Sequence, residues 1–209
     1  MDIQEYIVAP GNFNFVDLCD EADEADRKTL ELFAFGTFET YCKYRDQYER
    51  LNGPMTWKLI QLLVLSVVNH HENTSVSIDS VLDQHGVRQG IHWWLQQQLP
   101  QLTDVYETFD DVIKDMIKQE GIDARIDHEN DSIIVREARA LRDVYDPTFH
   151  HLQVLQPSDI SNQSLINALE VLRNWQNNHV EAMAKEFDIT KALLDPNPRK
   201  RKSQVLGIS

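Results

Sequence analysis

The sequence predicts a mainly α-helical fold, in which a helical-repeat bundle is followed by a winged helix and a long C-terminal helix. Three patterns predict it. A helix beginning near Pro54 is apolar on nearly all sides, a later helix ending at Gly121 runs into two alternating segments, and one apolar stripe follows the last helix. The expected divisions are an acidic flexible arm over 1–28, a domain over 29–145 with helical repeats over 29–86 and a winged helix over about 76–137, a bundle helix over 158–194, and a basic disordered tail over 195–209.

Two helices are expected ahead of the central one. An apolar cluster over 30–35 is interrupted by Gly36 and Thr37, so a short helix should end there. A second helix is predicted over 38–51, because aromatic and apolar residues recur on one face at helical spacing. These residues are Phe38, Tyr41, Tyr44, Tyr48 and Leu51. Asn52, Gly53 and Pro54 end this helix and allow the next to begin.

The next helix carries apolar residues around nearly its whole circumference. Between Trp57 and Val68 only a few positions are polar, among them Gln61 and Ser66. A helix of this kind needs neighbours on several faces, which is typical of a stacked helical array. We therefore expect it to form the centre of the core.

Residues 78–137 follow the order of a winged helix. A short helix over 78–84 closes at Gly86. A further helix is expected within 87–100, where residues such as Trp93 are buried or partner-facing, although Pro100 interrupts the helical spacing. The helix from Leu102 contains Thr108 and Asp111 in a capping-box pattern, at which it is expected to bend or restart. Gly121 is expected to supply its left-handed stop. Alternating residues then predict a strand over 122–127, and a polar turn over 128–131 leads to a second strand over 132–136, which together form a hairpin.

The last predicted helix covers about 158–194. Its stripe consists of Leu165, Leu169, Leu172, Trp175, His179, Met183 and Phe187. At 1.5 Å per residue such a helix is about 50 Å long, which is more than one small domain can cover. We therefore expect it to pack against another chain.

Composition restricts the classes of function. The 209 residues include 20 Lys and Arg against 34 Asp and Glu, a net charge of −14 that repels phosphate backbones. The longest apolar run, 59–68, is too short to span a bilayer, and the first thirty residues do not resemble a signal peptide. Two cysteines without C-x-x-C spacing favour a reducing compartment. We expect no membrane association and little binding to nucleic acid.

The two ends of the chain have opposite charge. Acidic residues crowd the first 26 positions, which we interpret as a weakly ordered arm that is either simply solvated or docks a partner. The other end carries the basic cluster Arg199, Lys200, Arg201 and Lys202. This cluster is either a nuclear-import signal or a solubilising end.

Motifs for catalysis, metal binding or a cofactor are not found in the sequence. The adjacent pairs His70–His71 and His150–His151 lack metal-ligand spacing, and there is no phosphate-binding glycine loop or nucleophile elbow. Acidic pairs such as Asp110–Asp111 have the character of solvated charges. We expect no catalytic residue, no metal site, no cofactor and no enzymatic activity.

Several segments resemble one family in matching order. The run LELFAFGTFETY over 30–41, followed by KLIQLLVLSVV over 58–68, resembles subunit seven of the COP-nine signalosome and its budding-yeast counterpart, usually called subunit nine. Residues 109–135 are similar to the winged-helix segment of that family, and LINALEVLRNW over 165–175 resembles its C-terminal helix. The first motif is the specific one. Residues 87–105 are longer than the family pattern.

The resemblance implies a PCI domain, the helical-repeat and winged-helix module shared by the proteasome lid, this signalosome and translation initiation factor three. It further implies a non-catalytic scaffold subunit, present in nucleus and cytoplasm. The whole complex removes a ubiquitin-like modifier from cullins (deneddylation) and so regulates cullin-RING ubiquitin ligases, with the chemistry in a different, zinc-binding subunit. The other subunits are the expected partners, bound through the winged-helix edge and the last helix. We predict a partner surface formed by Ile126, Ile133, Ile134, Val135, Leu165, Leu169, Leu172, Trp175 and Met183.

The alternative is a winged-helix nucleic-acid-binding protein, because this module often inserts its second helix into a major groove. The corresponding helix here carries Asp110, Asp111, Asp115 and Glu120 against Lys114 and Lys118. A net-acidic recognition helix binds phosphate poorly, so scaffolding is the favoured function.

Overall fold

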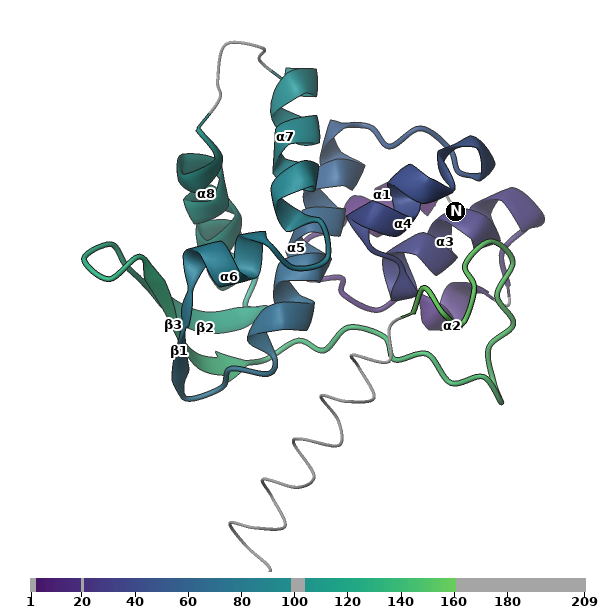
Figure 1. Cartoon of the computed structure of the whole chain (residues 1–209). Coiled ribbons are helices and arrows are strands. Elements are labelled where there is room, and N and C mark those ends of the chain that lie inside the picture. Colours follow the sequence, from purple (N-terminus) through teal and green to yellow (C-terminus); the bar gives the residue numbers. More distant parts are fainter. Residues whose placement is uncertain (1–2, 20, 99–103, 161–209) are drawn as a thin grey trace, which may run out of the picture. The chain divides into compact units, whose positions relative to one another are not determined.

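The computed structural model describes residues 3–19, 21–98 and 104–160, which form a mainly helical region followed by a small three-stranded antiparallel sheet (Figure 1). This arrangement is compatible with a helical bundle and a winged helix. The elements are α1 (Ile3–Val8), α2 (Val16–Cys19), α3 (Glu24–Phe35), α4 (Phe38–Lys43), the 3-10 turn η1 (Arg45–Gln47), α5 (Gly53–Val68), β1 (Thr74–Ser77), α6 (Ile78–Leu82), α7 (Val87–Gln98), α8 (Val105–Lys118), β2 (Ile122–Asp127) and β3 (Ser132–Ala138).

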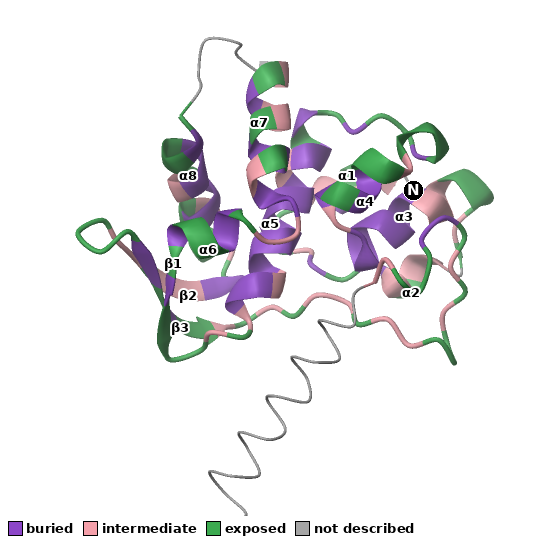
Figure 2. Ribbon diagram, viewed as in Figure 1, coloured by how far each residue is buried: buried purple, intermediate pink, exposed green. Residues whose placement is uncertain are grey.

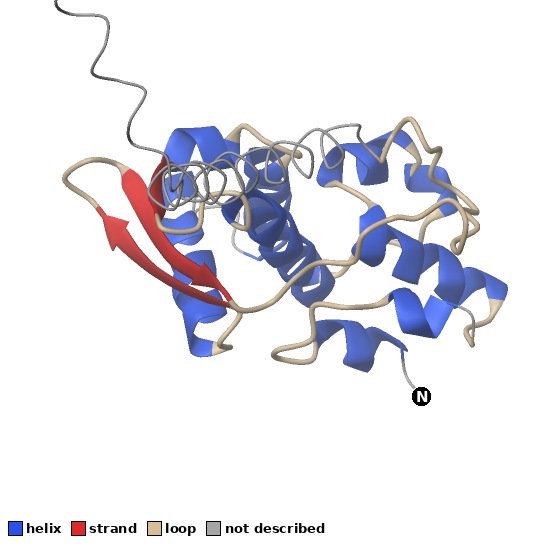
Figure 3. Cartoon of the chain, turned by 90° about the horizontal axis from the view of Figure 1, so that it is seen from below, coloured by secondary structure: helices blue, strands red, loops and turns tan. Residues whose placement is uncertain are grey.

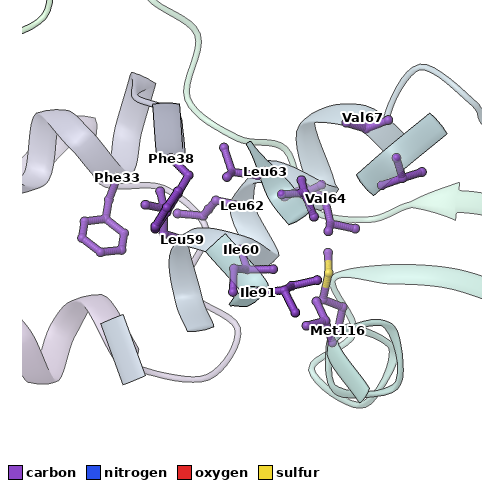
Figure 4. Packing of buried hydrophobic residues seen from close by; sticks show 14 of the residues in the cluster. Phe33, Phe38, Leu59, Ile60, Leu62, Leu63, Val64, Val67, Ile91 and Met116 are labelled. Carbon is purple, nitrogen blue, oxygen red and sulfur yellow. The ribbon is translucent and has the colours of Figure 1, made fainter. Parts of the chain in front are cut away.

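The helix α5 lies at the centre of the core, as predicted. Thirteen of its sixteen residues are buried, and the helix appears almost wholly buried in Figure 2. It contacts α1, α4, α6, α7, α8 and β3. Figure 4 shows its apolar side chains packed between residues of α3 and α4 on one side and of α7 and α8 on the other. The side chain of Asn52 caps its start by accepting from the Met55 amide, with Pro54 in the first turn.

The helix α3 ends at Phe35, as predicted, and Thr37 then caps α4 in a reciprocal capping box with Thr40. The predicted helix over 38–51 is wrong beyond Lys43, because α4 stops there and the chain turns through η1. Two apolar residues beyond α4, Tyr48 and Leu51, are still buried in the core, although the backbone that carries them is irregular. The Leu51 amide donates to the Tyr41 hydroxyl at 3.3 Å, which ties the end of this path to α4.

The expected acidic flexible arm over 1–28 is a folded part of the domain over its described residues. Ile7, Phe13 and Phe15 are buried, and the Phe15 ring lies 5.8 Å from that of Phe33. Acidic residues dominate the composition here, and the apolar residues are divided between two short helices and the irregular segment that joins them, so no helical period shows. The prediction failed for this reason.

The side chain of Lys58 joins the N-terminal segment to α5. It is only 3% exposed, and its ammonium donates to the carbonyls of Ala9 and Asn12 at 3.0 and 3.2 Å. Burial lowers the pKa of Lys58 to about 8, although the charge of Asp115 opposes this shift. Folding therefore favours the neutral amine, which still has hydrogens to donate to both carbonyls.

This geometry predicts a pH dependence. Between about pH 8 and the unfolded value near 10.5, the unfolded state holds a proton that the folded state has lost, so the free energy of unfolding rises with pH. We expect the contribution of Lys58 to rise by on the order of 1–3 kcal/mol across this window. Urea unfolding of the wild type and of Lys58→Met at successive pH values measures it. Parallel curves for the two proteins would contradict the assignment.

The sheet has the strand order β1-β3-β2, with β3 antiparallel to both neighbours. The predicted hairpin of β2 and β3 is confirmed, with β3 extending to Ala138 rather than Arg136. The strand β1 was not predicted, because Val76 is its only apolar and only buried residue and gives no visible alternation. It pairs with β3 so that Val76 lies opposite Ile133.

The helix α8 is continuous, so the predicted restart at Thr108 is wrong. Asp104 caps its start, and the Thr108 hydroxyl donates back to the Asp104 carbonyl. The left-handed residue at its end is Glu120, with φ of 59°, and not Gly121 as predicted. The amides of both residues close a Schellman motif on the last turn. Gly121 is required for another reason: a Cβ there would lie 2.7 Å from the ring of Phe13.

The helices α6 and α7 complete the described domain. Gly86, with φ of +77°, closes the turn after α6 as predicted, and the helix predicted within 87–100 is confirmed over Val87–Gln98. The rings of Trp57 and Trp94 lie 4.7 Å apart and join α7 to α5.

Within the described parts of the chain, no helix has the length and apolar character needed to cross a membrane.

Candidate partner-binding surface

The hairpin residues predicted to contact partners divide between the two faces of the sheet. Ile133 and Val135 are fully buried in the core, so they are not available to a partner in this fold. Ile126 pairs with Ile133 and is half-buried. Ile134 points to the opposite face and is 36% exposed. The prediction is corrected accordingly, since Ile134 alone among the three predicted β3 residues faces outward.

The physical reason is that the face of β3 carrying Ile133 and Val135 packs against the helical core, where β3 contacts α5. The edges of β3 are not free either. This strand lies between β1 and β2, so its backbone groups already pair on both sides. Among the described strands, β1 and β2 are the outer ones, and each pairs only with β3. An outer strand presents backbone donors and acceptors that can extend a sheet. In β1 the exposed side chains are Thr74, Ser75 and Ser77, all small and polar.

The remaining predicted partner residues, Leu165, Leu169, Leu172, Trp175 and Met183, lie outside the described residues. The basic cluster Arg199, Lys200, Arg201 and Lys202 lies outside them as well. The helix predicted from about Ser158 does not begin there, because residues 158–160 form a turn and a bend.

The outer face of α8 is acidic, which bears on the nucleic-acid alternative. Its exposed Lys114 lies 3.2 Å from the carboxylate of Asp111, so part of its charge is already neutralised. Asp110 lies 3.5 Å from His128 in the turn between β2 and β3. That turn adds Glu129 and Asp131. A duplex approaching this face would therefore meet more negative than positive charge.

Sequence reasoning missed a segment that we call the strap, residues 139–160. It leaves β3 and runs back along the helical half past α2 and α3, as Figures 1 and 3 show from two directions. It has almost no regular secondary structure. Three of its apolar side chains are strongly exposed: Leu141 at 65%, Val144 at 75% and Phe149 at 75%. Exposed apolar side chains on an ordered segment are a common feature of interaction surfaces.

The start of the strap is held by Asp143. Its carboxylate accepts from the backbone amides of Phe15 and Val16 at 2.6 and 3.2 Å, next to the start of α2. The side-chain amide of Asn14 donates to the Leu141 carbonyl at 3.0 Å. The strap therefore binds the N-terminal segment that the sequence suggested was flexible.

The end of the strap is held by Asp159. One carboxylate oxygen accepts from the ammonium of Lys43 and the other, at 2.7 Å, from the hydroxyl of Tyr44. Burial raises the pKa of Asp159, but the hydrogen bonds from Lys43 and Tyr44 outweigh it, so its pKa lies below the usual value. Between the two ends, the ring of Phe35 lies 5.6 Å from Tyr145 and 5.4 Å from His150.

No arrangement for metal chemistry is found in the part of the chain that the structure describes. There, no group of three or more His, Cys, Asp or Glu side chains is placed to hold a metal ion. The features that remain are surfaces: two outer strands, one outward isoleucine and the exposed apolar residues of the strap.

In comparisons with known proteins, no family model matches the chain. A search of curated proteins likewise finds no significant match.

Proposed function

We propose that this chain is a non-catalytic scaffold subunit with a PCI domain, working in an assembly of the COP-nine signalosome type. The observation that supports it is a helical array built around α5, followed by a three-stranded antiparallel sheet of order β1-β3-β2 that is compatible with a winged helix. The module offers surfaces for other subunits and, in its described residues, no cluster for metal chemistry. Removal of the ubiquitin-like modifier from cullins then belongs to another, zinc-binding subunit.

The motif that carries the family resemblance supports this proposal through packing. Within residues 30–41, Leu30, Leu32 and Phe33 are fully buried, and Thr37 provides the capping box that starts α4. These residues determine how α3 and α4 meet α5. Because the resemblance lies in core residues, it is direct support for a shared fold. Its support for a shared binding partner is less direct.

The structure changes which residues belong to the proposed partner surface. Ile134 remains in it and the outer strands β1 and β2 are added, whereas Ile133 and Val135 are removed because they are buried in the core. The apolar stripe from Leu165 to Met183 remains part of it as predicted from the sequence. Strand addition supplies main-chain hydrogen bonds, and an amphipathic helix supplies apolar burial.

Affinity purification of the tagged full-length chain, followed by mass spectrometry, tests the proposal. We expect recovery of other PCI subunits and of an activity that removes the modifier from a cullin, while the isolated chain has no such activity. The untagged strain is the control. A chain that purifies alone and shifts duplex DNA in an electrophoretic assay at physiological salt would instead support the nucleic-acid alternative.

A further inference from the structure

Two charged side chains, Glu31 of α3 and Arg142 of the strap, hold the strap against α3 from opposite directions. We propose that they form a latch, which fixes the path of the strap and can open while the core around α5 stays folded. The latch belongs to the isolated chain, so this inference does not depend on the proposed function.

Glu31 anchors the second half of the strap. Its side chain is only 3% exposed, yet it is a carboxylate inside the apolar cluster over 30–35. It accepts three backbone hydrogen bonds, from Gln153 at 2.5 Å, Val154 at 3.0 Å and Leu155 at 2.7 Å. Hydrogen bonds to an ionised acceptor are about twice as strong as neutral ones. Three consecutive amides therefore converge on one buried carboxylate.

Arg142 anchors the first half of the strap. Its guanidinium donates to the carbonyls of Leu32, Phe33 and Gly36, where α3 ends, and more weakly to the Ser66 hydroxyl of α5. The last carbonyls of a helix lack partners within it and carry the negative end of its dipole. Burial lowers the pKa of Arg142 to about 10, although Asp143 opposes this shift, so the guanidinium remains charged at neutral pH.

The two contacts are complementary. The helix α3 offers a carboxylate to strap amides and, in the residues that follow Glu31, carbonyls to a strap guanidinium. The strap residues between the two contacts include the exposed Val144 and Phe149. Of the strap's large apolar residues, only Val154 and Leu155 are fully buried, while Tyr145, Leu152 and Ile160 are partly buried against the core. Attachment therefore combines polar bonds with limited apolar contact, whereas α5 depends on a large apolar core, and the two regions should open with different free energies.

The last described residues of the strap are held at a further point, where Asp159 binds Lys43 and Tyr44. With Glu31 holding residues 153–155, the path over residues 153–160 is fixed from two points on the helical half.

Native-state hydrogen exchange on the full-length chain tests the latch. In Glu31→Gln the side chain keeps its shape but loses its charge and one acceptor. We expect the amides of Gln153, Val154 and Leu155 to exchange at least about tenfold faster than in the wild type, with α5 amides unchanged. The matched control is Glu39→Gln, an exposed glutamate of the neighbouring helix, which should leave both sets of amides at wild-type rates.

A second variant distinguishes opening of the latch from unfolding of the whole domain. Arg142→Lys keeps the positive charge but loses the planar fork that reaches several carbonyls. It should speed exchange in the first half of the strap and spare α5. Unchanged exchange at 153–155 in Glu31→Gln would overturn the proposal. So would equal acceleration of the strap and α5 in both variants, because the two regions would then open as one unit.

Discussion

Replacing Leu169, Leu172 and Trp175 together with serine is expected to release the chain from its partners. All three residues lie on the apolar stripe predicted for the last helix. Burying one such side chain contributes about 1.5–3 kcal/mol. Loss of all three should therefore weaken association by about three orders of magnitude or more. Pull-down of partners with the tagged variant, compared with the wild type, measures the effect.

The matched control replaces three polar residues of the same segment: Asn167→Ser, Asn174→Ser and Asn177→Ser. It should keep wild-type binding, because these side chains lie off the predicted stripe. Both triple variants should unfold at the wild-type temperature, because the sequence predicts that this segment packs against another chain. If the Leu and Trp variant still recovered its partners in full, the stripe would not be a partner surface.

The second large effect concerns the core. Leu62→Ala should lower the free energy of unfolding by about 2–5 kcal/mol, because the side chain is fully buried on α5 and its removal leaves a cavity. Figure 4 shows Leu62 in the middle of the apolar cluster. Since domains of this size are commonly stable by only about 5–15 kcal/mol, the loss is a large part of the total. Urea unfolding followed by circular dichroism measures it.

The same substitution on the strap provides the comparison. Leu141→Ala removes the same atoms from a side chain that is 65% exposed, so the free energy of unfolding should change by no more than about 0.5 kcal/mol. Equal losses from Leu62→Ala and Leu141→Ala would mean that α5 is not the centre of the core.

The parts of the fold that sequence predicted well are those with long, regular patterns. The helix α5 has sixteen residues that are apolar almost all round, and β2 alternates over its six residues. Short elements were harder. The strand β1 contains one buried residue, and α2 has four residues in all. Such elements are specified by the partners they meet in the folded chain and not by a local period.

The candidate site was predicted less well, for a related reason. Alternation along β3 shows that Ile133 and Val135 share a face, but it does not show which face is covered. Because β1 was missed, β3 looked like an outer strand with a free edge, and its apolar residues looked like a free surface. The pairing of β1 with β3 closes that edge, and the contact of β3 with α5 covers the face of Ile133 and Val135. The outward Ile134 was included in the prediction, but the sequence did not distinguish it from its neighbours.

The path of the strap could not be predicted from the sequence, because the polar contacts that hold it to α3 join residues far apart in the chain. Glu31 and Val154 are 123 positions apart, and Arg142 and Phe33 are 109 apart. Neither a carboxylate in an apolar helix nor an arginine in a loop indicates its partner. The one available signal was Glu31 itself, a charged residue inside the apolar cluster over 30–35, where an unpaired charge would be costly to bury.

If this chain is a scaffold, as we propose, neighbouring subunits need it to stay in the assembly, and native mass spectrometry of the assembly measures this need. The assembly is purified through a different subunit, from cells with and without this chain. We expect that, without the chain, neighbouring subunits are lost and the mass falls by much more than the chain's own 24.3 kDa. An assembly that lost only 24.3 kDa and kept every other subunit would show that the chain is not a scaffold.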